Sequence, residues 1–478
     1  MSQSMASLIL PTPPSWYPGH MRQFLRNLPA LLGRTDVVLE LRDSRLPLTS
    51  INGTFEGVLQ KWRHERQILA QKFLNQGPAY LSSSAPSLRG HSSLVCEHIV
   101  VMNKRDLVPE WGIEPFQRAI ESRFPNQRTI FASWNRPKDV KNLHETIVNI
   151  ARDNAHVSNE LNVLVVGMPN VGKSTLLNAL RNMGIPGPTP KALRTSANPG
   201  LTRALSTRLK LSQEPLVYSY DSPGVMLPFM GKGDLGAERG IKLALIAGIR
   251  AGLYPNETLA EYLLYQLNLL NPLAPAYLSI LPPGSPPTDD VFLFLDLLAQ
   301  RLNMLKRGGE RDLGRASEWF IRWWREEGCA MSSNAPFLTQ EGLESEAGET
   351  GHHVGSPLKV LDSPDAVNEV LRQREASLDV QRGAKDGVQR GGWGFDFQWE
   401  LSTSDVANAR KAGADMQAIV QREMERVIDE YAARVEEESK EGGDVSSTQL
   451  KKREKEIKKA KREKRIKEML ERRRSGKK

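Results

Sequence analysis

The sequence contains very little cysteine. Cys96 and Cys329 are the only two among 478 residues, too few for a disulfide scaffold or a four-cysteine zinc site. A reducing compartment is the simplest environment for such a chain. The sequence also lacks an apolar run long enough to span a bilayer, since Lys242 and Arg250 interrupt the best candidate at 240–254. We therefore expect no transmembrane segment.

The first fifteen residues lack charge altogether. They have neither the basic start of a secretory signal nor the arginine-rich face of a mitochondrial presequence, and we interpret 1–15 as a flexible leader. Hydrophobic residues make up 39% of the chain, below the roughly 45–50% of compact domains. Part of the chain is therefore predicted to be solvated or disordered, although its length leaves room for two or three domains.

Positive charge is concentrated at the C-terminus. The formal net charge is +9, but residues 451–478 alone contain 16 Lys and Arg against 5 Glu, a net charge of +11. The remainder is close to neutral, so any electrostatic attraction to nucleic acid belongs to this tail. The tail is interpreted as an RNA-contacting arm, and a plain charged coil or a targeting signal remains the alternative.

Short, β-branched runs bounded by polar residues predict buried strands. Helix-like stretches separate successive runs, and this alternation is typical of a parallel sheet with helices on both faces. After Pro223 the pattern becomes helical as far as about residue 328. The predicted class is therefore α/β followed by a small all-helical domain. The predicted strands are 36–41, 98–102, 128–133, 161–167 and 215–221.

A phosphate-binding loop follows the fourth predicted strand. "GMPNVGKST" (167–175) fits the pattern Gly-x-x-x-x-Gly-Lys-Ser, and a helix-like stretch follows it. The glycines let backbone N–H groups surround a phosphate chain, the lysine adds a charge at the β- and γ-phosphates, and the serine offers an oxygen to Mg²⁺. The residues predicted to bind nucleotide here are Gly167, Asn170, Val171, Gly172, Lys173, Ser174 and Thr175.

Two downstream segments complete a predicted magnesium and γ-phosphate site. "DSPG" (221–224) follows the fifth strand, where Asp221 can hold the metal through water and the Gly224 N–H can meet a γ-phosphate. Thr202 in "TSANPGLTR" is the candidate second hydroxyl ligand of Mg²⁺, beside Ser174. Taken alone, Asp-x-Pro-Gly is an ordinary turn and Thr202 a plain loop residue. Their position after a phosphate loop favours the metal and γ-phosphate roles over these ordinary ones.

A candidate guanine-binding loop, "NKRD" (103–106), follows the second predicted strand. Asp106 can accept hydrogen bonds from the N1–H and exocyclic amine of guanine, donors that adenine does not present together. Asn103 can reach the base and bridge to the phosphate loop, while the Lys104 stem covers the ring. Ser133, at the end of the third strand, suits the loop whose backbone N–H meets the guanine O6. Each of these motif matches, taken alone, could occur by chance.

The order of these elements argues against chance. Guanine loop, Ser loop, phosphate loop, Thr segment and Asp-x-x-Gly form the usual GTPase set with its last two members moved to the front. A parallel sheet permits this rotation when old termini are joined and a new break opens at the surface. On these motifs, together with "WYPGHM" (16–21) and "LRDSRLPLTS" (41–50), the chain resembles the circularly permuted GTPases of ribosome assembly, in the bacterial ribosome-biogenesis and mitochondrial GTPase 1 group.

The resemblance covers about 16–328 and implies slow hydrolysis of GTP to GDP and phosphate with Mg²⁺. It also implies a monomer that binds rRNA and the precursor of the large ribosomal subunit. The implied compartment is the mitochondrial matrix, with peripheral inner-membrane association. A nucleolar or cytosolic large-subunit GTPase, and an RNA-binding scaffold gated by nucleotide, are the alternatives.

Two further roles are implied by the resemblance. Val225 follows Asp-x-x-Gly, where many GTPases place a water-orienting glutamine, and valine cannot hydrogen-bond a water. The family points to His20 in "YPGHM" as the catalytic residue that holds this water, acting with Lys173, although a lone histidine is more often structural. Asn170 resembles the asparagine that helps bind K⁺ in potassium-stimulated GTPases, so K⁺ is a second expected cation.

The expected organisation combines these assignments. The permuted GTPase domain carries a departure from the family, the long polar insertion at 52–97. Its switch segments lead directly into the helical domain, so loss of the γ-phosphate could re-aim those helices. The expected boundaries are a leader at 1–15, the GTPase domain at 16–230, the helical domain at 231–328, a disordered linker at 329–402, and a charged helical region with the basic tail at 403–478.

Overall fold

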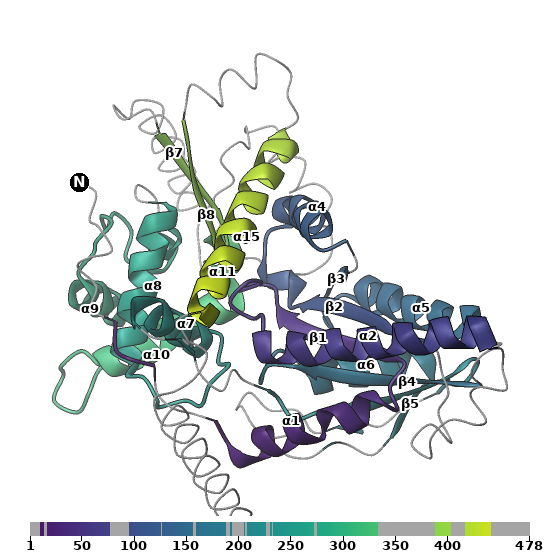
Figure 1. Ribbon diagram of the computed structural model, residues 1–478. Helices are drawn as coiled ribbons and strands as arrows, with labels where there is room; N and C mark the ends of the chain where they lie inside the picture. The colour runs from purple at the N-terminus through teal and green to yellow at the C-terminus, as the bar shows by residue number, and fades with distance from the viewer. Residues whose placement is uncertain are drawn as a thin grey trace, which may run out of the picture.

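A six-stranded sheet forms the centre of the computed structural model (Figure 1). The strand order is β3-β2-β1-β4-β6-β5, and all neighbours pair in parallel except β5, which is antiparallel to β6. The structure describes residues 10–13, 17–76, 95–125, 127–155, 159–187, 192–193, 205, 208–225, 230–231, 233–271, 275–332, 388–402 and 416–440.

The predicted α/β class is confirmed, and each predicted strand is present within two residues of its expected ends. β1 and β4 are buried along nearly their whole length because both faces of the parallel sheet are covered. The short edge strand β5 was not predicted, since "LKLS" has too few apolar residues to stand out. The strands are β1 (Val37–Asp43), β2 (Glu97–Asn103), β3 (Arg128–Ala132), β4 (Glu160–Gly167), β5 (Leu209–Ser212) and β6 (Leu216–Asp221).

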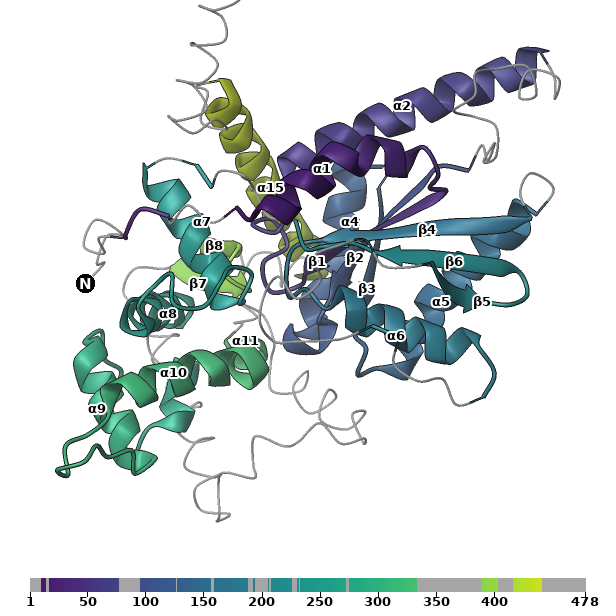
Figure 2. The same cartoon turned by 90° about the horizontal axis from the view of Figure 1, so that it is seen from below.

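Helices cover both faces of the sheet, as predicted (Figure 2). On one face, α1 (Gly19–Leu32) and α2 (Gly53–Gln76) pack over alternate residues of β1 and β4, including Val38 and Leu164. On the other, α5 (Pro137–Asp153) and α6 (Lys173–Gly184) pack over the intervening residues, including Leu39 and Val165. This alternation is the period-2 side-chain pattern of a strand. The α2 helix fills the first part of the predicted insertion, and 77–94 lies outside the described residues.

The region after β6 is helical, as expected. Its helices are α7 (Gly233–Leu245), α8 (Asn256–Leu270), α9 (Val291–Arg301) and α10 (Leu313–Trp323), with a 3-10 turn at Ala276–Ile280, a π turn at Trp324–Gly328 and the short α11 (Cys329–Met331). Their apolar faces join one continuous core that also includes strand residues such as Val163. The Arg45 guanidinium donates to the Arg325 carbonyl, and Asn170 to the Ala247 carbonyl. The helical region therefore lies against the carboxyl edge of the sheet.

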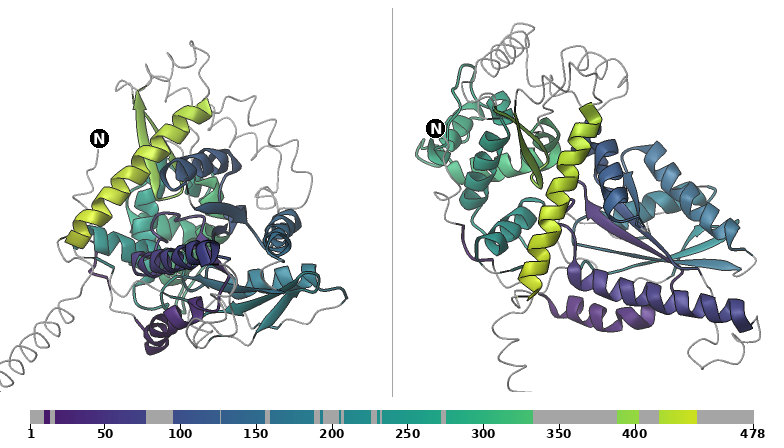
Figure 3. Two further views of the ribbon diagram at one scale, coloured as in Figure 1. Left: turned by 45° about the vertical axis from the view of Figure 1, so that its right-hand side comes forward. Right: turned by 45° about the horizontal axis from the view of Figure 1, so that its top comes forward.

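A C-terminal hairpin and helix complete the described fold. β7 (Val388–Trp393) and β8 (Phe397–Ser402) pair antiparallel, within the segment expected to be a disordered linker. α15 (Met416–Lys440) lies alongside the helix α4 (Ile113–Arg123) and passes between the sheet and the helical region (Figure 3). Buried Trp393, Phe397 and Met424 form one apolar cluster with α4 and β3. The expectation of disorder therefore fails for 388–402, because this segment has aromatic side chains to bury.

Candidate functional site

Five parallel strands end together at the edge where the predicted site residues lie. Asp43 pairs with Asn103 in the sheet register, Asn103 with Ala132, and Leu41 with Gly167. In parallel α/β sheets, ligands bind at the carboxyl ends of the strands. The register therefore gathers the predicted guanine, serine and phosphate loops at one edge.

The phosphate loop has the backbone of an anion cradle. Gly172 has φ +92°, in the left-handed region that favours glycine, and α6 begins immediately after it. The Lys173 Nζ donates to the carbonyls of Gly167 (3.1 Å) and Met168 (2.7 Å), which holds its charge over the centre of the loop. Burial lowers the pKa of Lys173 to about 8, partly opposed by Asp221. Among the described residues, the hydrogen bonds of this ammonium group go to neutral carbonyls, and a phosphate would supply an anionic partner.

Two candidate metal ligands meet beside this loop. The Ser174 hydroxyl donates to the Asp221 carboxylate at 2.6 Å. Burial raises the pKa of Asp221, and Lys173 works against that rise. A hydroxyl and a carboxylate at a helix start are the oxygen donors that Mg²⁺ accepts alongside phosphates and water, so the residues fit the expected ion. Thr202 lies outside the described residues.

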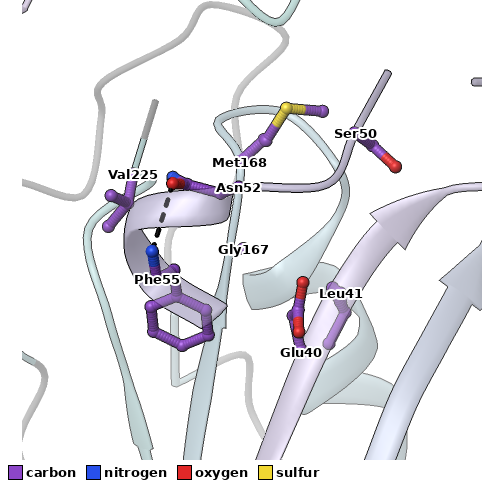
Figure 4. Close-up of a pocket in the computed structure, with 8 residues that line it drawn as sticks. All are labelled: Glu40, Leu41, Ser50, Asn52, Phe55, Gly167, Met168 and Val225. Carbon is purple, nitrogen blue, oxygen red and sulfur yellow. Dashed lines mark hydrogen bonds between the residues drawn. The ribbon is translucent and has the colours of Figure 1, made fainter. Parts of the chain in front are cut away.

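The Asp-x-x-Gly turn lies tightly against the phosphate loop. A Cβ placed on Gly224 would lie 2.6 Å from the Pro169 Cα, so a side chain there would separate the two segments. The Val225 N–H donates to the Gly167 carbonyl at 3.0 Å. The Val225 side chain is buried, and it lines a small pocket on the α2 side of Gly167 (Figure 4).

The guanine loop touches the phosphate loop directly. The Asn103 Nδ2 donates to the Val171 carbonyl at 2.6 Å, so the bridge expected of Asn103 is present. Lys104 adopts φ +62°, which turns the chain sharply after β2. The Asp106 carboxylate accepts from the Asn135 side-chain amide at 3.3 Å, which brings the guanine and serine loops together.

Ser133 lies at the same edge but is fully buried. Its own N–H donates to the Asp139 carboxylate at 3.2 Å, and its hydroxyl accepts from the Asn135 N–H. Ser133 therefore shapes the loop, and a backbone N–H for a guanine O6 has to come from another residue of that loop.

Sequence reasoning gave no role to a second set of residues that contact the guanine loop. These are residues 43–50, which we call the strap; they begin with the last residue of β1 and lie in "LRDSRLPLTS". The Asp43 carboxylate pairs with the Lys104 Nζ at 2.9 Å and with the Arg45 guanidinium at 2.8 Å. Ser44 donates to the Asn103 carbonyl through both its N–H (3.0 Å) and its hydroxyl (2.7 Å). The available signal was their position, because residues that follow neighbouring parallel strands meet at one edge.

The contact between the strap and the guanine loop shifts the pKa values of the charged groups that form it. Burial alone would raise the pKa of Asp43, but Arg45 and Lys104 hold that pKa well below its ordinary value. The pKa of Lys104 is lowered by burial and by Arg45, against the pull of Asp43. Asp43 is therefore charged, and it fixes the amine end of the lysine whose stem was predicted to cover the base.

A second buried ionic cluster lies beneath the phosphate loop. Glu40, which lines the pocket of Figure 4, accepts from the Arg42 Nε at 2.7 Å and pairs with the His98 Nε2 at 3.0 Å. Arg42 also donates to Glu56 on α2 at 2.6 Å. Burial opposes ionisation of Glu40, yet Arg42 and His98 lower its pKa to about 2. This cluster ties β1 to β2 and α2 next to Gly167.

The remaining predicted residues have the following places. His20 lies in the first turn of α1, with its Nε2 buried, and its catalytic role stays a prediction. The Asn170 amide contacts the helical region at the Ala247 carbonyl (2.9 Å). Thr175 lies in the first turn of α6. Among the described residues, no group of three or more His, Cys, Asp and Glu could hold a metal.

Strand order and loop order together define a circularly permuted P-loop GTPase domain, with a helical region after it. The family model described as "50S ribosome-binding GTPase" matches residues 162–260. Mitochondrial GTPase 1 of Schizosaccharomyces pombe is 30% identical over 315 residues, covering 66% of this chain and 87% of that protein. This chain therefore belongs to the mitochondrial GTPase 1 family of GTPases.

Two further comparisons accompany this assignment. Mitochondrial ribosome-associated GTPase 1 of Mus musculus is 30% identical over 257 residues, which is 53% of this chain and 66% of that protein. Among solved structures, GNP-bound YlqF from T. maritima matches 64% of this chain and 94% of its own, with 18% identity and a TM-score of 0.37. Within the part of the chain that the structure describes, no helix is long and apolar enough to cross a membrane.

Proposed function

We propose that this chain is a GTP-hydrolysing assembly factor for the large ribosomal subunit of the mitochondrion. Family membership gives the GTPase activity, and the names of the relatives from S. pombe and mouse supply the compartment and the ribosome. The observation that carries the proposal is the hydrogen bond from Asn103 to the Val171 carbonyl. It joins the loop that would read guanine to the loop that would hold its phosphates.

In the proposed site, Lys173 binds the β- and γ-phosphate oxygens and exchanges its two carbonyl contacts for them. Ser174, Asp221 and Thr202 would hold Mg²⁺, directly or through water, and the metal would supply positive charge next to the phosphates. The Gly224 N–H meets the γ-phosphate. Each role places a charge or donor against the phosphate oxygens over which the transition-state charge is spread, which is the usual source of catalysis in this chemistry.

Guanine is read by the NKRD loop. Asp106 exchanges its contact with Asn135 for the N1–H and amine of the base, while Lys104, anchored by Asp43, lays its stem over the ring. The water-holding role proposed for His20 and the K⁺ proposed near Asn170 complete the site. Val225 is buried and apolar, so its side chain leaves the water to another residue.

The nucleotide state is proposed to switch affinity for a ribosomal precursor through the helical region. Asn170 of the phosphate loop contacts Ala247, and Arg45 of the strap contacts Arg325, so the phosphate loop and the strap both adjoin these helices. The angle between the sheet and the helical region should differ between forms bound to a GTP analogue and to GDP. Identical angles would remove this part of the proposal.

RNA contact is assigned to the basic tail, which lies outside the described residues. Lysine and arginine contacts to phosphates release counterions, so binding should fall steeply with salt. Truncation after Thr448 should weaken binding to rRNA and flatten that salt dependence. Unchanged affinity and salt dependence would assign the tail to targeting or to a plain solvated coil.

The decisive test of the site is Asp106→Asn. Two hydrogen bonds to a carboxylate are worth about 1.5–3 kcal/mol each, so the variant should bind GDP at least a hundredfold more weakly. It should prefer xanthosine diphosphate, because an amide can donate where the carboxylate accepted. Binding of fluorescent diphosphates measures both. Unchanged selectivity for guanine would contradict the assignment.

Two alternatives have direct tests. If Lys173→Ala abolishes nucleotide binding while subunit assembly proceeds normally, the protein is an RNA-binding scaffold whose hydrolysis is incidental. If a fluorescent fusion lies in the nucleolus or cytosol, with or without residues 1–15, the nucleolar or cytosolic alternative is correct. Sequencing the rRNA that co-purifies with a GTP-locked variant identifies the particle.

A further inference from the structure

The turn between β7 and β8 lies inside the molecule, between the strap and the helical region. The side chain of Asp396, the last residue of this turn before β8, is 3% exposed. Its carboxylate accepts three hydrogen bonds from the far end of the strap: from the N–H of Leu48 (3.0 Å), the N–H of Thr49 (2.8 Å) and the Thr49 hydroxyl (2.6 Å). A side chain more than 340 positions away in sequence therefore clamps this loop.

The same turn is held from the other side by the helical region. The Lys242 Nζ of α7 donates to the Phe395 carbonyl at 3.1 Å and pairs with Asp396 at 3.4 Å. The Phe395 ring stacks on Trp324 with centroids 4.8 Å apart and planes 16° apart, and Arg45 lies over the same indole at 5.7 Å. The turn is thus wedged between α7, the π turn and the strap.

The backbone of this turn approaches the strap so closely that position 394 requires glycine. Gly394 has φ +68°, and a Cβ built on it would lie 2.9 Å from the Arg45 carbonyl oxygen. Any larger residue would therefore both strain the turn and push it away from the strap.

The near end of the strap holds the guanine loop. Ser44 donates twice to the Asn103 carbonyl, and Asp43 pairs with Lys104. Asp396 is therefore hydrogen-bonded to one end of the strap, and the other end of the strap is hydrogen-bonded to Asn103 and Lys104, which are proposed to contact the base. Among the described residues, the hydrogen bond that joins the phosphate loop to this set of contacts runs from Asn103 to the Val171 carbonyl.

We propose that the 393–397 turn is a positioning element of the guanine site, and that Asp396 sets the affinity for guanine nucleotides by fixing the strap. This inference rests on the proposed guanine-binding role of 103–106. With the strap clamped, Asn103 and Lys104 are held in place before a nucleotide arrives. With the clamp released, binding must first order the strap, and that ordering costs affinity. The phosphate loop has its own internal hydrogen bonds, such as those of Lys173. Loss of the clamp should therefore lower the affinity for the base more than the affinity for the phosphates.

The test is Asp396→Asn in the full-length chain. Asparagine has the same shape, and its carbonyl oxygen can still accept from the N–H groups of Leu48 and Thr49. Its uncharged amide, however, turns N–H groups towards the Thr49 hydroxyl and the Lys242 ammonium, where one carboxylate oxygen accepted from both. We expect GDP affinity to fall about tenfold, a typical coupling between sites, and the ratio of GDP to ADP affinity to fall with it. Thr49→Val, which removes one of the three hydrogen bonds, should give a smaller change in the same direction.

The matched control is Asp429→Asn on α15. Asp429 pairs with Arg123 at 2.7 Å and ties the C-terminal segment to α4 without touching the strap, so its GDP affinity and selectivity should match the wild type. If Asp396→Asn binds GDP within twofold of this control, or loses GDP and ADP affinity equally, the inference is wrong. If Asp396→Asn does not fold, Thr49→Val decides by the same selectivity ratio. A wild-type chain that fails to bind GDP would instead refute the proposed function.

Discussion

Replacing Glu40 by glutamine should destabilise the protein in a pH-dependent way. Glu40 is 2% exposed and is enclosed by Arg42 and His98. Its pKa falls from 4.5 to about 2 on folding, despite the opposing effect of burial. A lowered carboxyl pKa adds stability above its unfolded value, and that stability is lost as the pH falls towards the folded value. A shift of this size corresponds to about 3 kcal/mol at neutral pH.

Glu40→Gln removes the charge but keeps the shape. At pH 7 we expect the free energy of unfolding to fall by about 3 kcal/mol, close to the usual cost of breaking a buried ion pair. At pH 3 the wild-type glutamate has itself lost most of this benefit, so the difference should shrink to about 1 kcal/mol. Urea unfolding of both proteins at pH 7, 5 and 3 measures the change.

The control is Glu110→Gln, which removes a carboxylate that is 53% exposed and paired with Arg105. A surface pair of this kind contributes about 1 kcal/mol or less, so its effect should be small at every pH. If Glu40→Gln costs the same at pH 3 as at pH 7, the Glu40 cluster does not stabilise the fold as argued here.

Three further outcomes follow from the site. The pKa of Lys173 is lowered to about 8 in the free protein, so GDP binding should take up protons above this pH, and affinity should fall about fivefold between pH 8 and pH 9; calorimetry in buffers of different ionisation enthalpy measures the uptake. Gly172→Ala places a Cβ 2.6 Å from the Asn103 Nδ2 at φ +92°, a cost on the order of 2 kcal/mol, and a GDP titration should show at least tenfold weaker binding. Asp43→Asn leaves the buried Arg45 guanidinium and the partly buried Lys104 ammonium without their carboxylate, so thermal unfolding should show a loss of about 3–5 kcal/mol of stability.

The sheet could be predicted because its chemistry is local. Runs such as "DVVLEL" and "LNVLVVG" are apolar, β-branched and short, and each is followed by the polar residues of a loop. The motif order then placed the loops at one edge, since parallel strands bring their carboxyl ends together. The contact between Asn103 and Val171 is the direct outcome of that reasoning.

The strap and its clamp could not be predicted in the same way. Asp43 and Ser44 were visible as part of a motif, but which side chains they hold depends on the register between β1 and β2. Asp396 lies after a long Gly-, Ser- and Glu-rich segment, and nothing in "WGFDFQWELS" indicates a partner near residue 48. Its role depends on a long-range contact, and such contacts leave no local pattern in one sequence.

The distance along the chain between Thr49 and Asp396 also has a consequence for biosynthesis. Their hydrogen bond spans 347 positions, and at about 5–20 residues per second the second partner is made roughly 20–70 seconds after the first. In the last part of that interval, once residue 224 has been made, the emerging chain contains every proposed nucleotide loop but not the residue proposed to clamp the strap. On the proposed role of Asp396, the newly made protein can complete its guanine site only after almost all of the described chain has been made.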